Sequence, residues 1–448
     1  MKSRLPKVLH PLCGLHMLDH VLNAVQQSGI KRTVLVTPPS SPRIQRHAGG
    51  AIVNAEQPQP LGTGHAVLCA MPFLEGPPAR SRGMSNGSSK DAAEHVLVLA
   101  GDVPLLRSEP LQALMARHLE EQADVTVLTA VGMPPDGLGR VVRDGSGSVA
   151  RIVEERHALY AQERIEEINS GIYCFRAAAL WPRLAELTPS PTGELYLTDV
   201  VDMTVRSGGR VAAYTAPDPW DAFGVNTRRQ LVQAAAIMRR RICDHWLDQG
   251  VTVVDPASTF LDATVVIGRD TVVQPNTHLR GATRVGRDCV VGPGAVVVDT
   301  VIADRCEVQG SVLEGAVLER RARVGPFCHL RPGAHLMEDV HLGNFVEVKE
   351  STVGKGTAAG HFSYLGDATI GKNVNIGAGT ITCNYDGKQK LRTTIGDNAF
   401  IGSDTMLVAP ISVGNRSSTG AGSVVTRDVP DDTLVVGVPA KPRQRPSP

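Results

Sequence analysis

The second half of this chain places an aliphatic residue at every sixth position. The uninterrupted positions are Ile267, Val273, Leu279, Val285, Val291 and Val297, and the spacing resumes at Ile395, Ile401, Leu407 and Val413. It fits neither an α-helix, with about 3.6 residues per turn, nor a single strand, whose side chains alternate between two faces. Six-residue repeats whose aliphatic residue is often followed by glycine, as in Ile267-Gly268, are typical of short strands that coil into a parallel β-helix. We therefore predict such a coil over residues 251–436, with the aliphatic side chains inside it.

The first half of the chain has a different pattern and is expected to form a domain of its own. Strand-like runs such as Thr33–Thr37 and His95–Leu99 alternate with segments of helical spacing such as His16–Gln27. This alternation predicts an α/β domain with a mostly parallel sheet.

Three segments mark the boundaries within the chain. Apolar residues at helical spacing predict a linking helix from Thr227 to Leu247, ended by Gly250. The Ser-, Gly- and Pro-rich segment 77–93 is expected to be an exposed, mobile loop, and a non-periodic insertion at 383–394 interrupts the coil. The expected domains are therefore 1–226, 227–250 and 251–448, the last ending in a disordered tail at 439–448.

Composition narrows the classes of function. The chain carries 46 basic and 45 acidic side chains, for a formal charge of +1, which argues against a general nucleic-acid or membrane-surface role. Its 8 cysteines lack paired spacing, so neither a disulfide framework nor a thiolate zinc site is expected, and a reducing cytoplasm fits best. No uncharged apolar run is long enough to span a bilayer, and the first residues do not form a signal-peptide core. We therefore expect a soluble cytoplasmic protein that binds small molecules.

Short motifs in both halves resemble those of one enzyme family. In the first half they are LPKVLH (5–10), QPQPLGTGHA (57–66), AGDVPLL (100–106), GLGRVV (137–142), INSGIY (168–173) and FGVNT (223–227). In the coil they are RPGAHL, NFVEVKEST, AGHFSYLGDATIG and NIGAGTITCNYDG. The first set resembles the nucleotide-sugar pyrophosphorylases. Both sets together resemble the bacterial bifunctional N-acetylglucosamine-1-phosphate uridyltransferases and glucosamine-1-phosphate acetyltransferases, over nearly the whole chain.

This resemblance implies a fold and two reactions. The fold is an α/β Rossmann-like nucleotidyltransferase domain followed by a left-handed parallel β-helix of hexapeptide repeats. Acetyl-CoA would acetylate glucosamine 1-phosphate in the coil, and UTP would then couple to N-acetylglucosamine 1-phosphate with Mg²⁺, releasing pyrophosphate. The UDP-N-acetylglucosamine formed would feed cell-wall synthesis. A homotrimer is also implied, because acetyltransferases of this coil type complete their sites between subunits.

The first half supplies the residues that the nucleotidyl transfer needs. Asp102 follows a predicted strand, where open α/β sheets bind ligands, and its carboxylate suits a hard Mg²⁺ ion. The resemblance implies that Asp102 and Asn226 hold the metal and that Lys7 meets the phosphates. The remaining residues that it implies at UDP-N-acetylglucosamine are Gln57, Gly62, Thr63, Gly139, Glu154 and Asn169. Taken singly, an aspartate after a strand is more often a helix cap, but the ordered match favours the functional interpretation.

One departure from the family concerns the phosphates of UTP. Relatives begin with a strand that leads into a loop of the form L-x-x-G-x-G-T-R-M, whose N–H groups and arginine hold the triphosphate. This sequence starts at a position that matches the final methionine of that loop. We expect greatly reduced uridylyl transfer and a sheet without its first central strand, unless the reading frame was opened too late.

The coil supplies the residues for acetyl transfer. The ammonium of the sugar must lose a proton before it attacks a thioester, so a base of near-neutral pKa is needed, and His361 matches the base of the family. Glu347 is a hypothetical partner of that imidazole. The resemblance implies Arg331, Lys349, Tyr364 and Asn375 at glucosamine 1-phosphate. It implies Ala378, Asn384, Tyr385, Ser403 and Ala421 at acetyl-CoA, with Asn384 also near the sugar and an N–H near Ala378 at the oxyanion.

A second departure and three alternatives remain open. Where some relatives have an arginine for the coenzyme phosphates, this chain has Val438, with Lys441, Arg443 and Arg445 nearby.

The chain could instead be another sugar-1-phosphate nucleotidyltransferase with a regulatory coil, or an acetyltransferase alone. It could also be a non-catalytic scaffold for oligomers beside an inactive transferase domain. Release of thiol from acetyl-CoA would distinguish the nucleotidyltransferase with a regulatory coil from an enzyme that transfers acetyl groups.

Overall fold

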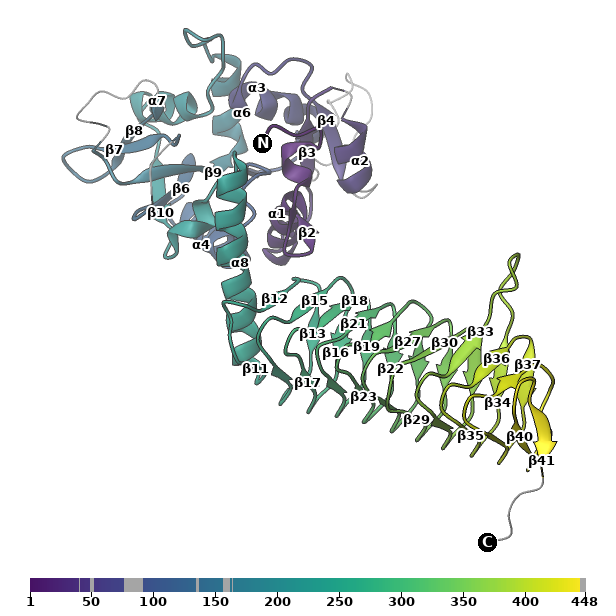
Figure 1. Ribbon diagram of the computed structural model, residues 1–448. Coiled ribbons are helices and arrows are strands. Elements are labelled where there is room, and N and C mark those ends of the chain that lie inside the picture. Colours follow the sequence, from purple (N-terminus) through teal and green to yellow (C-terminus); the bar gives the residue numbers. More distant parts are fainter. Residues whose placement is uncertain are drawn as a thin grey trace, which may run out of the picture. The chain divides into compact units, whose positions relative to one another are not determined.

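The chain divides into two compact units, each with its own core (Figure 1). Unit 1 comprises Met1–Leu12 and His16–Ala235, and unit 2 comprises Cys13–Leu15 and Ala236–Pro448. This computed structural model describes residues 1–39, 41–48, 52–75, 92–133, 137–155, 162 and 164–443. The expected loop at 77–93 lies outside the described residues up to position 91. No helix among the described residues is both long and apolar enough to cross a bilayer.

Unit 1 alternates strands and helices, as the sequence predicts. Its strands are β1 (Pro11–Leu12), β2 (Leu15–His16), β3 (Val34–Thr37), β4 (Val53–Glu56), β5 (His95–Val98), β6 (Val125–Ala130), β7 (Arg140–Arg143), β8 (Val149–Val153), β9 (Ile168–Arg176) and β10 (Val211–Thr215). Its helices are α1 (Met17–Gln27), α2 (Pro42–Ala48), α3 (Thr63–Ala70), α4 (Ser108–Glu120), α6 (Ala177–Ala185) and α7 (Thr198–Arg206), with a 3₁₀ turn at Lys7–Leu9. The Rossmann-like α/β class is therefore confirmed.

The main sheet of unit 1 is mixed rather than mostly parallel. The strand order is β10-β6-β9-β7-β8, and β5 also pairs with β9. β9 runs antiparallel to both β5 and β6, whereas β10 is parallel to β6. The expectation of a mostly parallel sheet is thus wrong at β9, because an apolar run predicts that a strand is buried and not in which direction it runs.

A second, smaller sheet of unit 1 consists of β3 and β4, which pair in parallel from Val34 opposite Val53 to Thr37 opposite Glu56. Among the described residues, neither strand pairs with the larger sheet. Side chains of β3 and β5 both line one cavity of about 830 Å³. Apolar strand residues such as Val36 and Leu97 are therefore only half-buried, although their sequence is typical of a core.

The predicted linking helix is present as α8 (Arg228–Asp248). Thr227 begins it, because the hydroxyl of this residue accepts the N–H of Gln230 at 3.2 Å. The side chain of Gln230 in turn accepts the N–H of Thr227 at 2.9 Å, so the two residues form a reciprocal cap. Gly250 follows the helix with φ of 84°, a conformation that favours glycine.

Unit 2 is the predicted left-handed parallel β-helix, which runs from β11 (Thr252–Val253) to β40 (Leu434–Val436). Three sheets of 12, 10 and 9 strands form its sides. Consecutive six-residue positions enter different sheets, and the same sheet returns after three of them, so Ile267 lies beside Val285 and Leu279 beside Val297. The six-residue spacing is therefore the length of one side of the coil.

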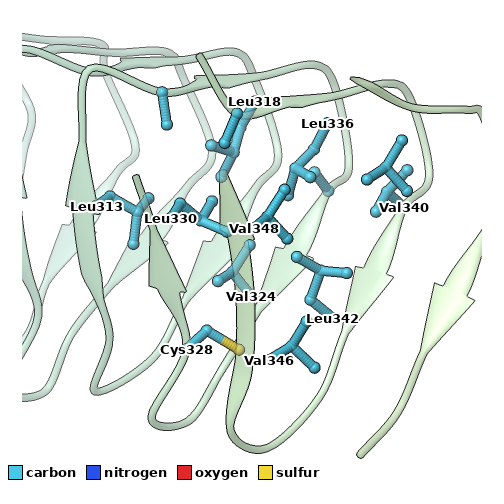
Figure 2. Close-up of a cluster of buried hydrophobic side chains, with 14 of the residues drawn as sticks. Leu313, Leu318, Val324, Cys328, Leu330, Leu336, Val340, Leu342, Val346 and Val348 are labelled. Carbon is cyan, nitrogen blue, oxygen red and sulfur yellow. The ribbon is translucent and has the colours of Figure 1, made fainter. Parts of the chain in front are cut away.

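The interior of the coil is a continuous column of aliphatic side chains (Figure 2). Leu313, Leu330 and Val348 are register partners on neighbouring strands of the 10-stranded sheet, and each is 0% exposed. Leu318 and Leu336 pair in the same way on the 9-stranded sheet. Because each turn buries its aliphatic residues only against the turns above and below, the stack as a whole stabilises the coil.

The insertion and the tail complete unit 2. The coil is interrupted between β33 (Ile381–Cys383) and β34 (Thr393–Ile395), as predicted, and an isolated bridge joins Tyr385 to Lys390 within the insertion. The expectation of a disordered tail at 439–448 is wrong for its first part, because Lys441–Arg443 forms β41 and pairs antiparallel with β40. Residues 444–448, including Arg445, lie outside the described residues.

Candidate active sites

The first candidate site lies on the 10-stranded sheet of unit 2, where β24 (His329–Leu330), β27 (Val346–Lys349) and β30 (Ser363–Gly366) are neighbours. Arg331 follows β24, and its N–H donates to the carbonyl oxygen of Val348 at 2.8 Å. The register therefore places Arg331 beside Lys349 and Glu347 beside Tyr364. Parallel register alone gathers these four predicted residues on one face of the coil.

Asp367 connects the residues on this face. Its carboxylate accepts from the Asn384 amide at 2.5 Å and lies 3.3 Å from the Lys349 ammonium. The same amide donates to the Tyr364 hydroxyl at 3.2 Å. Asn384 is only 5% exposed, so the start of the insertion is fixed against the coil. The result is a patch with two cations, Arg331 and Lys349, beside fixed hydroxyl and amide groups, which suits a phosphorylated sugar.

Gly366 makes this arrangement possible. A Cβ atom on Gly366 would lie 2.3 Å from the Tyr364 hydroxyl and 2.7 Å from the Asn384 amide nitrogen. Any larger residue would have to displace one of these two side chains. The glycine is therefore required because the Tyr364 side chain lies along its own strand, over Gly366.

His361 begins a row of equivalent positions along one corner of the coil. Ala359, Ile376 and Ile401 are register partners, and the residues two positions later are His361, Ala378 and Ser403. The row continues to Ala421, whose neighbour Gly422 donates its N–H to the Ser403 carbonyl oxygen at 2.8 Å. His361, Ser403 and Ala421 are exposed, and Ala378 is half-buried. An extended molecule could therefore lie along this corner with one end at the imidazole.

Glycines hold the turns of this corner close together. A Cβ atom on Gly377 would lie 2.5 Å from the Ser403 backbone nitrogen, and one on Gly402 would lie 2.8 Å from that of Ala421. Both glycines directly precede a residue of the row. The corner therefore presents backbone and small side chains at Ala378, Ser403 and Ala421.

Two predicted residues lie apart from this cluster within one chain. Asn375 is exposed on β32 (Asn375–Ile376), which belongs to the 12-stranded sheet, whereas Tyr364 belongs to the 10-stranded sheet. Tyr385 is 56% exposed in the insertion, where its hydroxyl donates to the Gly387 carbonyl oxygen at 2.7 Å. A single copy of the chain thus divides the implied acetyl-transfer residues between two faces of the coil.

The hypothesis that Glu347 supports His361 is not carried by the geometry. Its carboxylate accepts from the Arg331 guanidinium at 3.1 Å, and the described residues provide no bond from it to the imidazole.

Sequence reasoning also missed Asp367. The signal in the sequence was the aspartate of the motif YLGDATIG. In the structure Asp367 lies at a coil corner with φ of 51°, which is unusual for a residue other than glycine.

The second candidate site lies in unit 1 and is centred on Lys7. Its ammonium bonds to the Asp102 carboxylate and donates to the side-chain oxygen of Asn226 at 2.7 Å. The backbone carbonyl of Asp102 also accepts the N–H of Val225 at 2.9 Å, which fixes the two segments against each other. Three residues that are separated by about half the chain therefore meet at one point.

This point fits the magnesium ion that the family implies. The oxygens of Asp102 and Asn226 both contact one cation, the Lys7 ammonium, so they converge on a common position. Carboxylate and amide oxygens are the ligands that Mg²⁺ prefers, with water filling its other positions. Asp102 and Asn226 would hold the ion there, once Lys7 turns towards the phosphates of the substrate.

Four of the other predicted residues of unit 1, namely Thr63, Gly139, Glu154 and Asn169, line one cavity of about 830 Å³. Its lining also includes Asp102 and Asn226. Thr198 donates its hydroxyl to Glu154 at 2.9 Å, and the Asn169 amide donates to the hydroxyl of Tyr173 at 2.6 Å. Thr198 and Tyr173 were not predicted, and they position two of the residues that were.

Gln57 and Gly62, which the resemblance assigns to the base, lie in the loop that precedes Thr63 of the cavity lining. The amide of Gln57 donates to the Gly62 carbonyl oxygen at 3.0 Å. Gly62 has φ of 99°, and a Cβ atom there would lie 2.6 Å from the Leu195 carbonyl oxygen. Thr63 follows and accepts the Leu197 N–H at 3.1 Å. The motif therefore folds as a tight loop that begins α3.

Comparisons with known proteins show the family of the chain. Residues 1–200 match the family model of the MobA-like NTP transferase domain, and residues 264–299 and 392–427 match the bacterial transferase hexapeptide model. The bifunctional protein GlmU of Heliobacterium modesticaldum is 45% identical over 437 residues, which cover 97% of this chain and 92% of the relative. The GlmU proteins of Pelobacter propionicus and Listeria monocytogenes are 46% and 42% identical, again over 97% of this chain and 92% of the relative. The chain therefore belongs to the family of bifunctional GlmU proteins, which join a uridyltransferase domain to a hexapeptide acetyltransferase domain.

Proposed function

We propose that unit 2 transfers an acetyl group from acetyl-CoA to glucosamine 1-phosphate with His361 as the general base. The observation that carries this assignment is the corner row of His361, Ala378, Ser403 and Ala421, which offers an open path that ends at an exposed imidazole. His361 lies two residues before β30 of the 10-stranded sheet, and two cations on that sheet, Arg331 and Lys349, would hold the phosphate of the sugar.

The reaction can be written in terms of these residues. Arg331 and Lys349 bind the phosphate, while Tyr364 and Asn384 orient the sugar ring. His361 accepts a proton from the sugar ammonium, and the free amine attacks the thioester carbonyl. A backbone N–H near Ala378 stabilises the oxyanion. The carbon–sulfur bond then breaks, coenzyme A leaves as a thiolate, and the second proton of the nitrogen is released.

Unit 1 is proposed to join the product to UTP. Because the transferred group is a phosphoryl centre between two polyanions, the protein contributes mainly position and positive charge. Lys7 would face the phosphates, and Asp102 and Asn226 would hold Mg²⁺, which neutralises charge on the triphosphate. Gln57, Gly62 and Thr63 would contact the uracil, and Gly139, Glu154 and Asn169 the sugar. The expected weakness of uridylyl transfer stays a prediction.

The division of the acetyl-transfer residues supports a trimer. Asn375 lies on the 12-stranded sheet and Tyr364 on the 10-stranded sheet, so a site that uses both requires faces from two copies. A cytoplasmic location is proposed on other grounds. All 8 cysteines are free, and several are buried, which is typical of a reducing compartment.

A single substitution tests the central assignment. His361→Ala should reduce coenzyme A release at pH 8 by about 10²- to 10⁴-fold, the usual contribution of a general base, and leave uridylyl transfer unchanged. His335→Ala is the matched control, because His335 is a coil histidine that bonds to Glu319 at 2.8 Å on another sheet. Near-normal acetyl transfer by folded His361→Ala protein would refute the assignment.

A further inference from the structure

Two histidines and an aspartate of unit 1 lie together outside both candidate active sites. His16 directly precedes α1, Asp19 belongs to its first turn, and His47 lies near the end of α2. The Nδ1 atom of His16 is 3.2 Å from one carboxylate oxygen of Asp19, and the Nε2 atom of His47 is 2.6 Å from the other. The ring nitrogens of both histidines therefore meet one carboxylate, each at a different oxygen.

The spacing of these donor atoms suits a small metal ion. One ligand atom from each residue lies within 4.8 Å of the others. Tetrahedral zinc sites have metal–nitrogen and metal–oxygen distances of about 2.0–2.2 Å, so their ligand atoms lie roughly 3–3.5 Å apart. Two imidazoles and one carboxylate form a common zinc ligand set, with water at the fourth position. Only small side-chain rotations would separate the donor atoms enough to admit the ion.

Helix capping accounts for part of this cluster and not for all of it. Asp19 accepts the backbone N–H of His16 at 2.9 Å, which satisfies a free donor at the start of α1. The same cap could form with no histidine on α2. His47 comes from a separate segment, and its ring meets that of His16 edge to face with centroids 4.3 Å apart. The second imidazole is therefore the feature that a cap does not require.

The three side chains are also accessible enough to exchange an ion. The side chain of His16 is 40% exposed, that of His47 is 26% exposed and that of Asp19 is 23% exposed. Hydrogen bonds from His16 and His47 outweigh the effect of burial and lower the pKa of the Asp19 carboxyl, so it is ionised near neutral pH. A charged carboxylate beside two imidazoles attracts a divalent cation.

We propose that His16, Asp19 and His47 form a binding site for a divalent first-row transition metal, with Zn²⁺ as the reference ion. The ion would fasten α2 to the start of α1. In the same region Ile44, the one buried residue among the described residues of α2, packs in an apolar cluster with Leu9 and Leu18. The site would therefore be structural, and it is independent of both proposed reactions.

Titration with Zn²⁺ tests the proposal on the full chain. A reducing agent and saturating Mg²⁺ should be present, so that thiols stay reduced and the oxygens of Asp102 and Asn226 are occupied. Zn²⁺ uptake is measured by calorimetry and by competition with a chromophoric chelator. The unmodified protein should bind one more Zn²⁺ than His47→Gln or Asp19→Asn, and each variant should lose affinity at this site by more than about 100-fold.

His329→Gln is the matched control, because His329 bonds to Glu314 at 3.0 Å without a second imidazole. It should keep the full Zn²⁺ stoichiometry. Co²⁺ provides an independent readout, since its absorption distinguishes nitrogen and oxygen ligands from thiolates. Equal stoichiometry and affinity in the unmodified protein and His47→Gln would overturn the proposal. So would the absence of Zn²⁺ binding in the unmodified protein, which would leave the cluster as a hydrogen-bonded cap.

Discussion

The Asn384 amide donates to the Asp367 carboxylate across 2.5 Å, and this bond ties the insertion of unit 2 to the coil. The same carboxylate lies 3.3 Å from the Lys349 ammonium. Asp367 therefore fixes two residues of the proposed sugar site, Lys349 and Asn384, although it is not itself implied as a ligand.

Replacing Asp367 should weaken acetyl transfer through its two neighbours. In Asp367→Asn, Lys349 loses its counter-charge and Asn384 loses a charged acceptor. Hydrogen bonds to charged groups are worth about 1.5–3 kcal/mol, so kcat/KM for glucosamine 1-phosphate should fall roughly 10- to 100-fold. The KM for acetyl-CoA should change little. Asp397→Asn, which alters a corner acid that faces Lys372 at 3.4 Å, should keep normal kinetics.

Gly366 offers a steric test of the same site. In Gly366→Ala the new methyl group would lie 2.3 Å from the Tyr364 hydroxyl and force it to move. Displacing a positioning group by about 1 Å can cost about 100-fold in rate, so acetyl transfer should fall strongly while the coil stays folded. Gly360→Ala, where a Cβ atom meets nothing within 4 Å, controls for adding a methyl group and should keep the unfolding temperature. Unchanged acetyl transfer in Gly366→Ala would mean that Tyr364 is not needed where it lies.

Mixing two inactive variants tests whether sites form between copies. Tyr364→Ala and Asn375→Ala proteins should each be poorly active alone. If Tyr364 and Asn375 act from different copies, random 1:1 mixed trimers would restore about a quarter of the sites. The measurement is coenzyme A release after dissociation and reassembly of the mixture. No recovery in demonstrably mixed oligomers would show that both residues act from the same chain, or that Asn375 is not involved.

Lys7 is expected to compete with the metal for its ligands. Lys7→Gln should raise the affinity of unit 1 for Mn²⁺ by roughly 5- to 10-fold, because a competing ion pair of about 1 kcal/mol is removed. Uridylyl transfer should fall at the same time, since a phosphate contact is lost. Binding can be followed by electron paramagnetic resonance of free Mn²⁺. Lys31→Gln, at an exposed position, should change neither quantity, and a weaker Mn²⁺ affinity in Lys7→Gln would contradict the shared position.

His118 should make unit 1 less stable in acid. It is 0% exposed, and burial, together with the charges of His95 and Arg176, lowers its pKa to about 4. An unfolded histidine has a pKa of about 6.5, so between pH 6.5 and 4 the unfolded chain binds a proton that the folded chain does not. The free energy of unfolding should therefore fall by roughly 3 kcal/mol as pH decreases from 6.5 to 4. Above pH 6.5, His118 should not make this free energy depend on pH.

Native-state amide exchange of α4 and β6 measures this effect locally. His118→Gln should be less stable at pH 7, because the bond of His118 Nδ1 to the Thr126 hydroxyl at 2.9 Å is altered, but it should lose less stability on acidification. His335→Gln should leave the slope unchanged. An equal slope in His118→Gln would assign the acid sensitivity to other groups.

Sequence periodicity predicted the coil well because each turn depends only on its neighbours. Each aliphatic residue at a sixth position marks one side of the coil, so the local pattern is enough to predict the whole fold of unit 2. The direction of β9 was not predictable in this way. Its run of buried residues is the same whichever way the strand crosses the sheet.

The sequence by itself determined the two-part organisation, the coil, the linking helix and, through family motifs, the residue types at both candidate sites. Only the tertiary structure decided which of these residues meet. Register places Arg331 beside Lys349, and the insertion brings Asn384 to Asp367. Lys7 contacts Asp102 and Asn226, which are far from it in the sequence. Periodicity in the sequence indicates which residues of one element are buried. Contacts between residues that are distant in the sequence depend instead on how whole elements pack. The cluster of His16, Asp19 and His47 depends on such packing between elements, and no local sequence pattern predicts it.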